Sequence, residues 1–171
     1  ELELNGENIT LAGVVLDNGG ASLLDVDLDG SVDGGVKTLD VNGNLNIGSM
    51  TLDGQNSDDT VTIALDTDII GTNGDLDLDN TIGTISLDGA AGENEIKTTG
   101  GTGDISLGAV GNASTASDLI VSTATATTSG DITFGGIVSG VGYISANAGS
   151  TTTGNTGDVT VSAAMTANDA N

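Results

Sequence analysis

Short runs of alternating apolar and polar residues fill most of the chain, and glycine-containing turn signals separate them. In the run from Leu24 to Asp29, leucine or valine alternates with aspartate, so an extended strand points its apolar side chains to one face and its carboxylates to the other. No segment keeps the apolar spacing of an amphipathic helix over a useful length, so we expect an all-β chain. The same alternation predicts strands at residues 39–41, 45–47, 50–52, 61–65, 76–78, 85–87, 105–107, 119–121, 132–134, 143–146 and 159–161.

One of these strands recurs with the same turn in front of it. Gly-Asp followed by apolar-x-apolar begins at Gly74, Gly103, Gly130 and Gly157, and a relaxed copy with asparagine begins at Gly43. Successive first glycines are 31, 29, 27 and 27 residues apart. A repeat of this length accommodates three short strands and three turns, which is one coil of a parallel β-solenoid.

We therefore predict a parallel β-helix (β-solenoid) of roughly six coils, each of about 27–31 residues, forming one domain over residues 1–171. The shortening of the step along the chain predicts longer loops in the N-terminal coils. Asn-Gly and Asp-Gly pairs also favour two-residue hairpins, so an antiparallel meander or sandwich is the alternative. The solenoid is favoured because the repeat is too long for a hairpin and because all copies run in the same direction.

The chain is strongly negatively charged and lacks most of the reactive types of side chain. The 171 residues include 25 acidic ones against Lys37 and Lys97, for a formal net charge of −23, and 20 of the acids lie within residues 1–97. Such a chain repels phosphate backbones, which excludes nucleic acid as a partner. The only aromatic residues are Phe134 and Tyr143, and a narrow solenoid interior filled by stacked aliphatic side chains needs few of them.

The missing residue types also argue against an enzyme. Without His, Cys or Arg, the chain has no Ser-His triad, no thiol nucleophile, no imidazole metal ligand and no guanidinium clamp. A pair of carboxylates for glycoside hydrolysis remains, but sugar-cleaving clefts also use aromatic and basic residues. We therefore predict a protein that is not an enzyme and that requires no cofactor.

Calcium is the one ion that the sequence suggests. Asp25, Asp27, Asp29 and Asp33 follow the opening of a D-x-D-x-D-G calcium loop, but its twelfth position is Val36 in place of a bidentate glutamate. On an extended strand, alternate aspartates lie about 7 Å apart, too far for one ion to bridge without other ligands. A solvated acidic face is the favoured interpretation, and these four aspartates are the candidate calcium ligands.

No hydrophobic run approaches the roughly 20 residues that span a bilayer, so membrane insertion is not expected. Neither the first residues nor the segment from Met165 to Asn171 resembles the polar cap that protects the terminal coil of a solenoid. We therefore expect the chain to partner with itself, either as an end-to-end homopolymer or through further coils of the same long chain.

The repeated Gly-(Asp/Asn)-apolar-x-apolar strand, with continuations such as Val159–Ala164, resembles the repeats of filamentous-haemagglutinin-type and related giant bacterial surface adhesins over residues 40–171. The resemblance implies a right-handed parallel β-helix that is secreted and displayed at the bacterial cell surface. The resulting hypothesis is a structural protein of an extracellular filament or adhesin shaft that assembles by coil stacking. The alternative is a calcium- or carbohydrate-binding cell-surface module that contacts glycans of a host or a neighbouring cell.

Overall fold

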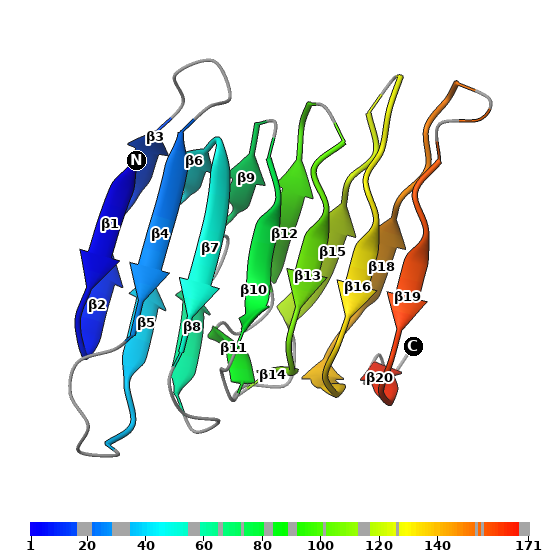
Figure 1. Cartoon of the computed structure of the whole chain (residues 1–171). Helices are drawn as coiled ribbons and strands as arrows, with labels where there is room; N and C mark the ends of the chain where they lie inside the picture. Colours follow the sequence, from blue (N-terminus) through cyan, green and yellow to red (C-terminus); the bar gives the residue numbers. More distant parts are fainter. Residues whose placement is uncertain are drawn as a thin grey trace.

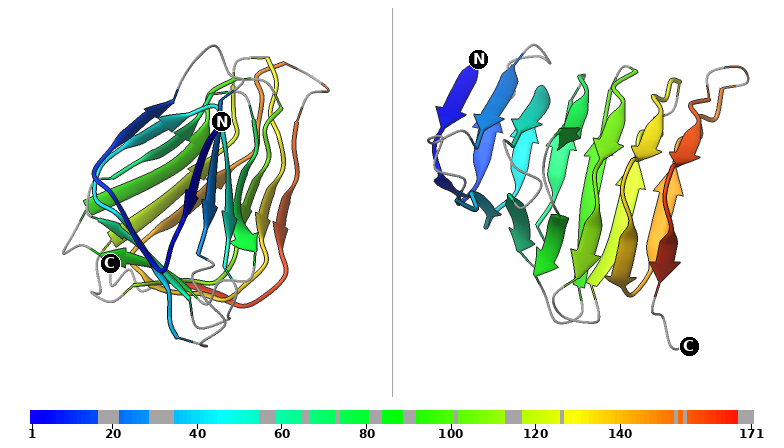
Figure 2. Two further views of the ribbon diagram at one scale, coloured as in Figure 1. Left: turned by 60° about the vertical axis from the view of Figure 1, so that its left-hand side comes forward. Right: turned by 60° about the horizontal axis from the view of Figure 1, so that its bottom comes forward.

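A computed structural model of the chain shows a stack of three-sided coils built from parallel strands (Figure 1). It describes residues 1–16, 22–28, 35–54, 59–64, 67–72, 74–80, 84–88, 92–100, 102–112, 117–125, 127–152, 154 and 156–167. These residues form strands and no helix, and hence none that is long and apolar enough to cross a membrane. The first and last coils lie at opposite ends of the stack (Figure 2).

Each coil contributes one strand to each of three sheets. Sheet A contains β1 (Leu2–Asn5), β4 (Leu23–Asp27), β7 (Ser49–Asp53), β10 (Leu76–Asn80), β13 (Ile105–Leu107), β16 (Ile132–Phe134) and β19 (Val159–Val161). Sheet B contains β2 (Asn8–Leu11), β5 (Thr38–Val41), β8 (Thr60–Ala64), β11 (Thr84–Asp88), β14 (Val110–Asn112), β17 (Val138–Val141) and β20 (Met165–Ala167). Sheet C contains β3 (Val14–Leu16), β6 (Leu45–Ile47), β9 (Ile69–Gly71), β12 (Gly92–Thr98), β15 (Ser117–Ser122) and β18 (Ile144–Asn147).

The predicted parallel β-helix is therefore confirmed. Six coils supply strands to all three sheets, and β19 and β20 begin a seventh. In sheet A, the first inward-facing residues of successive strands are paired and are spaced by 22, 26, 26, 29, 27 and 27 residues; they are Leu2, Leu24, Met50, Leu76, Ile105, Ile132 and Val159.

This register corrects one part of the sequence interpretation. The relaxed copy at Gly43 leads into β6 of sheet C, whereas the other copies lead into sheet A. The position equivalent to Gly74 is Gly48, whose carbonyl accepts a hydrogen bond from the Gly74 amide. Within one sheet, the first step is 22 residues in sheet A, from Leu2 to Leu24, but 30 in sheet B, from Asn8 to Thr38, and 31 in sheet C, from Val14 to Leu45. The step counted from Gly43 therefore does not measure one coil, and longer loops in the N-terminal coils stay a prediction. A glycine turn followed by an alternating strand occurs at more than one corner of the coil, so local similarity does not identify the sheet.

The core consists of aliphatic side chains and one phenylalanine, stacked in columns along the axis of the coils. Inward positions of the central strands, such as Leu78, Leu107 and Phe134, are almost completely buried, and they are paired across neighbouring coils. Burial of these apolar columns is the main force that holds one coil on the next.

Candidate functional site

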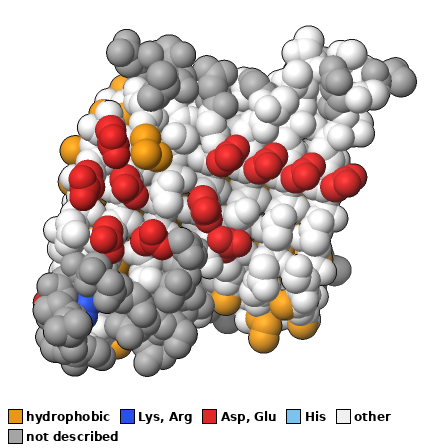
Figure 3. All heavy atoms as spheres, in the orientation of Figure 1, with side chains coloured by type: hydrophobic (Ala, Val, Ile, Leu, Met, Phe, Trp, Pro, Cys, Tyr) orange, Lys and Arg blue, Asp and Glu red, His pale blue; other side chains and the backbone are white. Residues whose placement is uncertain are grey.

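The outer face of sheet A carries most of the charge that the described residues expose (Figure 3). Both lysines lie elsewhere: Lys37 is buried before β5, and Lys97 in β12 forms an ion pair with Glu95 at 2.5 Å. This face therefore has a strongly negative potential and would attract cations and repel anions. We call it the acidic face; its carboxylates, in or directly before the strands of sheet A, are Glu1, Glu3, Asp25, Asp27, Asp53, Asp75, Asp77, Asp79, Asp104, Asp131 and Asp158.

Four of these aspartates form a chain of hydrogen bonds between coils. The Oδ1 atom of Asp75 accepts from the backbone amide of Asp104 at 2.9 Å, Asp104 Oδ1 accepts from Asp131 at 2.7 Å, and Asp131 Oδ1 accepts from Asp158 at 2.9 Å. We call this series the aspartate ladder. Each of the three accepting carboxylates satisfies an amide just before a strand begins, so the ladder extends the pairing of sheet A by one residue.

The glycine before each of these aspartates allows two backbones to approach closely. A Cβ atom added at Gly103 would lie 2.3 Å from the carbonyl oxygen of Gly74, and one added at Gly130 would lie 2.2 Å from that of Gly103. The described glycines with positive φ are Gly13, Gly140 and Gly154, which lie outside the repeat. The repeated glycine is therefore required by space and not by a left-handed turn.

Sequence reasoning did not find this role of the repeated aspartate, which it treated only as part of the turn before each strand. The bond partner is 27 or 29 residues away, so nothing in the local sequence indicates it. The available signal was position: the aspartate stands directly before the apolar strand in every copy from Gly74 onwards.

Replacement of Asp104 provides a test of the ladder. Asp104→Ala leaves the amide of Asp131 without its acceptor, and we expect it to lower the free energy of unfolding by about 1 kcal/mol, the usual net contribution of one hydrogen bond. Asp104→Asn keeps an oxygen at the same place and should retain most of the stability. Urea denaturation of both variants would measure the difference, and equal losses for alanine and asparagine would contradict the role of the ladder.

The candidate calcium ligands are only partly within the described residues. Asp25 and Asp27 lie on β4 and point to the acidic face, whereas Asp29 and Asp33 lie outside the described residues. Within the described part of the chain, no group of three or more His, Cys, Asp or Glu side chains is arranged to hold a metal ion. Calcium binding by the four aspartates therefore remains a prediction.

One aspartate of the acidic face has a perturbed acidity. Partial desolvation, the hydrogen bond with Asp77 and the negative charge of Asp77 together raise the pKa of Asp79 above its ordinary value of 3.8. The backbone amide of Asp79 lies 3.5 Å from Asp77 Oδ1. The negative charge of Asp77 is therefore close enough to disfavour ionisation of Asp79.

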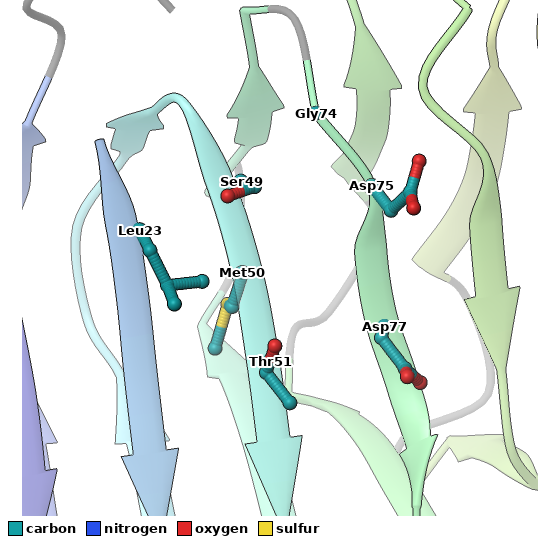
Figure 4. Close-up of a pocket in the computed structure, with 7 residues that line it drawn as sticks. All are labelled: Leu23, Ser49, Met50, Thr51, Gly74, Asp75 and Asp77. Carbon is teal, nitrogen blue, oxygen red and sulfur yellow. The ribbon is translucent and has the colours of Figure 1, made fainter. Parts of the chain in front are cut away.

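A shallow hollow with a volume of about 350 Å³ interrupts the acidic face over β7 (Figure 4). It forms because Ser49 and Thr51 on β7 are small. Leu23 on β4 lies on one side, and Asp75, directly before β10, and Asp77, on β10, lie on the other. Its polar groups are two hydroxyls and two carboxylates, and Asp75 already accepts the hydrogen bond from Asp104.

Comparison with known proteins identified no relative of this chain. The sequence matches no protein family, no curated protein and no solved structure with which we compared it.

Proposed function

We propose that this chain is a segment of a non-catalytic structural rod, the shaft of an extracellular filament or surface adhesin, which lengthens by the stacking of one coil on the next. The supporting observation is that the apolar columns reach the last coil without a break. Val159 and Val161 are 44% and 47% exposed, although they continue the columns of Ile132 and Phe134, which are fully buried. Side chains of this kind are expected to be covered by another coil.

The common direction of the strands supports the same mode of growth. All strand pairs in the three sheets are parallel, so the edge of the first coil and the edge of the last coil present opposite sides of the same hydrogen-bonding pattern. A head-to-tail contact between such unlike surfaces can repeat without closing. At the other end, Leu2 and Leu4 are half-buried members of the same columns. We infer that the partner is a further coil of the same type, from the same chain or from another copy.

The non-catalytic part of the proposal rests on chemistry. The chain lacks His, Cys and Arg, and the hollow on the acidic face offers carboxylates that are exposed or already engaged. The extracellular location rests on the resemblance of the Gly-Asp repeats to filamentous-haemagglutinin-type adhesins, with which a parallel solenoid agrees.

Electron microscopy and sedimentation of the purified chain would test the stacking. We expect rods that associate end to end as concentration rises, and we expect Val161→Lys to abolish this association because it places a charge on the exposed end of the core. Thr160→Lys is the matched control: it adds the same charge to the same strand, but on the outer side, where Thr160 is exposed. If the parent chain and both variants remain single particles at every concentration, stacking by this surface is wrong.

A further inference from the structure

One polar atom in the interior lacks a hydrogen-bond partner. Asn94 is an inward-facing residue of β12 and is completely buried. Its Nδ2 atom donates to the carbonyl oxygen of Ala64 at 2.8 Å and to that of Thr67 at 3.1 Å, so both of its hydrogens are used. Its Oδ1 atom accepts no hydrogen bond within the part of the chain that the structure describes. A buried acceptor without a donor is costly, and in folded proteins an ordered water usually supplies the missing bond.

The two carbonyl partners fix the orientation of the Asn94 amide. Carbonyl oxygens only accept hydrogen bonds, so turning the amide over would place Oδ1 against two other acceptors. Both partners belong to the third coil: Ala64 ends β8 in sheet B, and Thr67 lies shortly before β9 in sheet C. Asn94 therefore ties the fourth coil to the third at the corner between sheets B and C, and the donor for Oδ1 must come from another group.

The interior beside Asn94 is polar and contains little side-chain volume. Gly92, the preceding inward-facing residue of β12, has no side chain, and it is paired with Ser117 of β15 in the fifth coil. Ser117 is small and completely buried. The strand spacing and rise place the Cα atoms of Asn94 and Ser117 about 8 Å apart, a distance that two side chains and one water can span. Room and about two to four polar partners are what an internal water requires.

The neighbouring buried hydroxyls differ from Asn94 in this respect. Thr98 Oγ1 donates to the carbonyl oxygen of Gly103 at 3.3 Å, and Thr123 Oγ1 donates to that of Gly130 at 2.6 Å. Among the described residues, Asn94 Oδ1 is the one buried side-chain polar atom without a partner. The unmet acceptor is therefore specific to the corner between sheets B and C in the fourth coil.

We propose that Asn94 Oδ1 binds an internal water molecule at this corner, where the third, fourth and fifth coils meet. The water donates one hydrogen to Asn94 Oδ1 and the other to the hydroxyl oxygen of Ser117, which has two lone pairs. The Asn94 amide then connects three successive coils, the third through Nδ2 and the fifth through the water. The surrounding apolar columns keep bulk solvent away, so exchange of this water requires a local opening of the corner.

NMR cross-relaxation between water and backbone amides would detect this molecule. We expect long-lived water contacts at the amides of β12 and β15 around Asn94, and we expect Asn94→Leu to abolish them because leucine has a similar size and no acceptor. Relaxation dispersion of the solvent deuterons should fall by the equivalent of one bound molecule. Thr98→Val is the matched control: it removes a buried polar group from the same strand, but one that already has an acceptor, and it should leave the water signal unchanged.

Three results would overturn the proposal. The first is a parent chain without any long-lived water at these amides, a measurement that does not depend on the folding of a variant. The second is an Asn94→Leu chain that keeps the water contacts of the parent, because other groups would then hold the molecule. The third is an equal loss in Thr98→Val, which would indicate a general change of the interior in place of a site at Asn94.

Discussion

Gly130→Ala is expected to destabilise the rod by about 3 kcal/mol or more, which places it among the most damaging single substitutions. Its Cβ atom would lie 2.2 Å from the carbonyl oxygen of Gly103 and 2.6 Å from Asp104 Oδ1. Neither atom can move freely, because Asp104 Oδ1 accepts the hydrogen bond from the Asp131 amide and the Gly103 carbonyl oxygen accepts one from the Thr98 hydroxyl. The carbonyl of Gly130 itself accepts a bond of 2.6 Å from the buried hydroxyl of Thr123. One methyl group therefore disturbs the approach of two coils and the aspartate ladder together.

Gly135→Ala is the matched control for this prediction. It lies in the same coil, but a Cβ atom there would be 3.6 Å from the nearest backbone oxygen, which is an ordinary contact. We expect a change within about 1 kcal/mol, since alanine also reduces the freedom of the unfolded chain. Urea denaturation of both variants gives the comparison. Similar midpoints for Gly130→Ala and Gly135→Ala would show that close approach is not the reason for the repeated glycine.

The fold could be predicted because the main signal is local. Alternation of apolar and polar residues determines which side chains face inward, and strands such as β4, β8 and β16 follow it closely. Strand β12 was missed because two of its inward positions are polar. Asn94 and Thr98 are buried there: Asn94 Nδ2 donates to the carbonyl oxygens of Ala64 and Thr67, and Thr98 Oγ1 donates to that of Gly103. A polar residue indicates an outward-facing position only when the interior offers its side chain no hydrogen-bond partner.

The candidate site was less predictable than the fold. The alternation correctly placed Asp25 and Asp27 on an outer face, because every second residue of a strand points away from the core. The aspartate ladder depends instead on which coils become neighbours and in which register. Asp104 meets Asp131 only after a full coil has closed. Such relations are non-local, so a single sequence does not contain them in readable form.

Phe134→Ala is the second substitution for which we expect a large loss, about 3–5 kcal/mol. Phe134 is completely buried and lies in one column between Leu107 of the preceding coil and Val161 of the following one. Removing the ring leaves a cavity that the surrounding backbone cannot fill, because the pairing of sheet A fixes the spacing of the coils. Phe134→Leu is the control. Leucine already occupies this column at Leu78 and Leu107, so this variant should lose much less.

The location of the destabilisation caused by Phe134→Ala is as informative as its magnitude. In a stacked repeat each coil contacts only its neighbours, so stability is close to a sum of contacts between adjacent coils. The cavity of Phe134→Ala weakens the two contacts that its own coil makes. Hydrogen exchange should therefore show β16 and β19 opening together at low free energy, while β4 and β7 keep their protection up to the global value. If Phe134→Ala instead lowers protection equally from β4 to β19, the chain unfolds as one cooperative body. The rod would then unfold like a globular domain. A shaft that lengthens by coil stacking requires the opposite behaviour, in which each coil depends only on its neighbours.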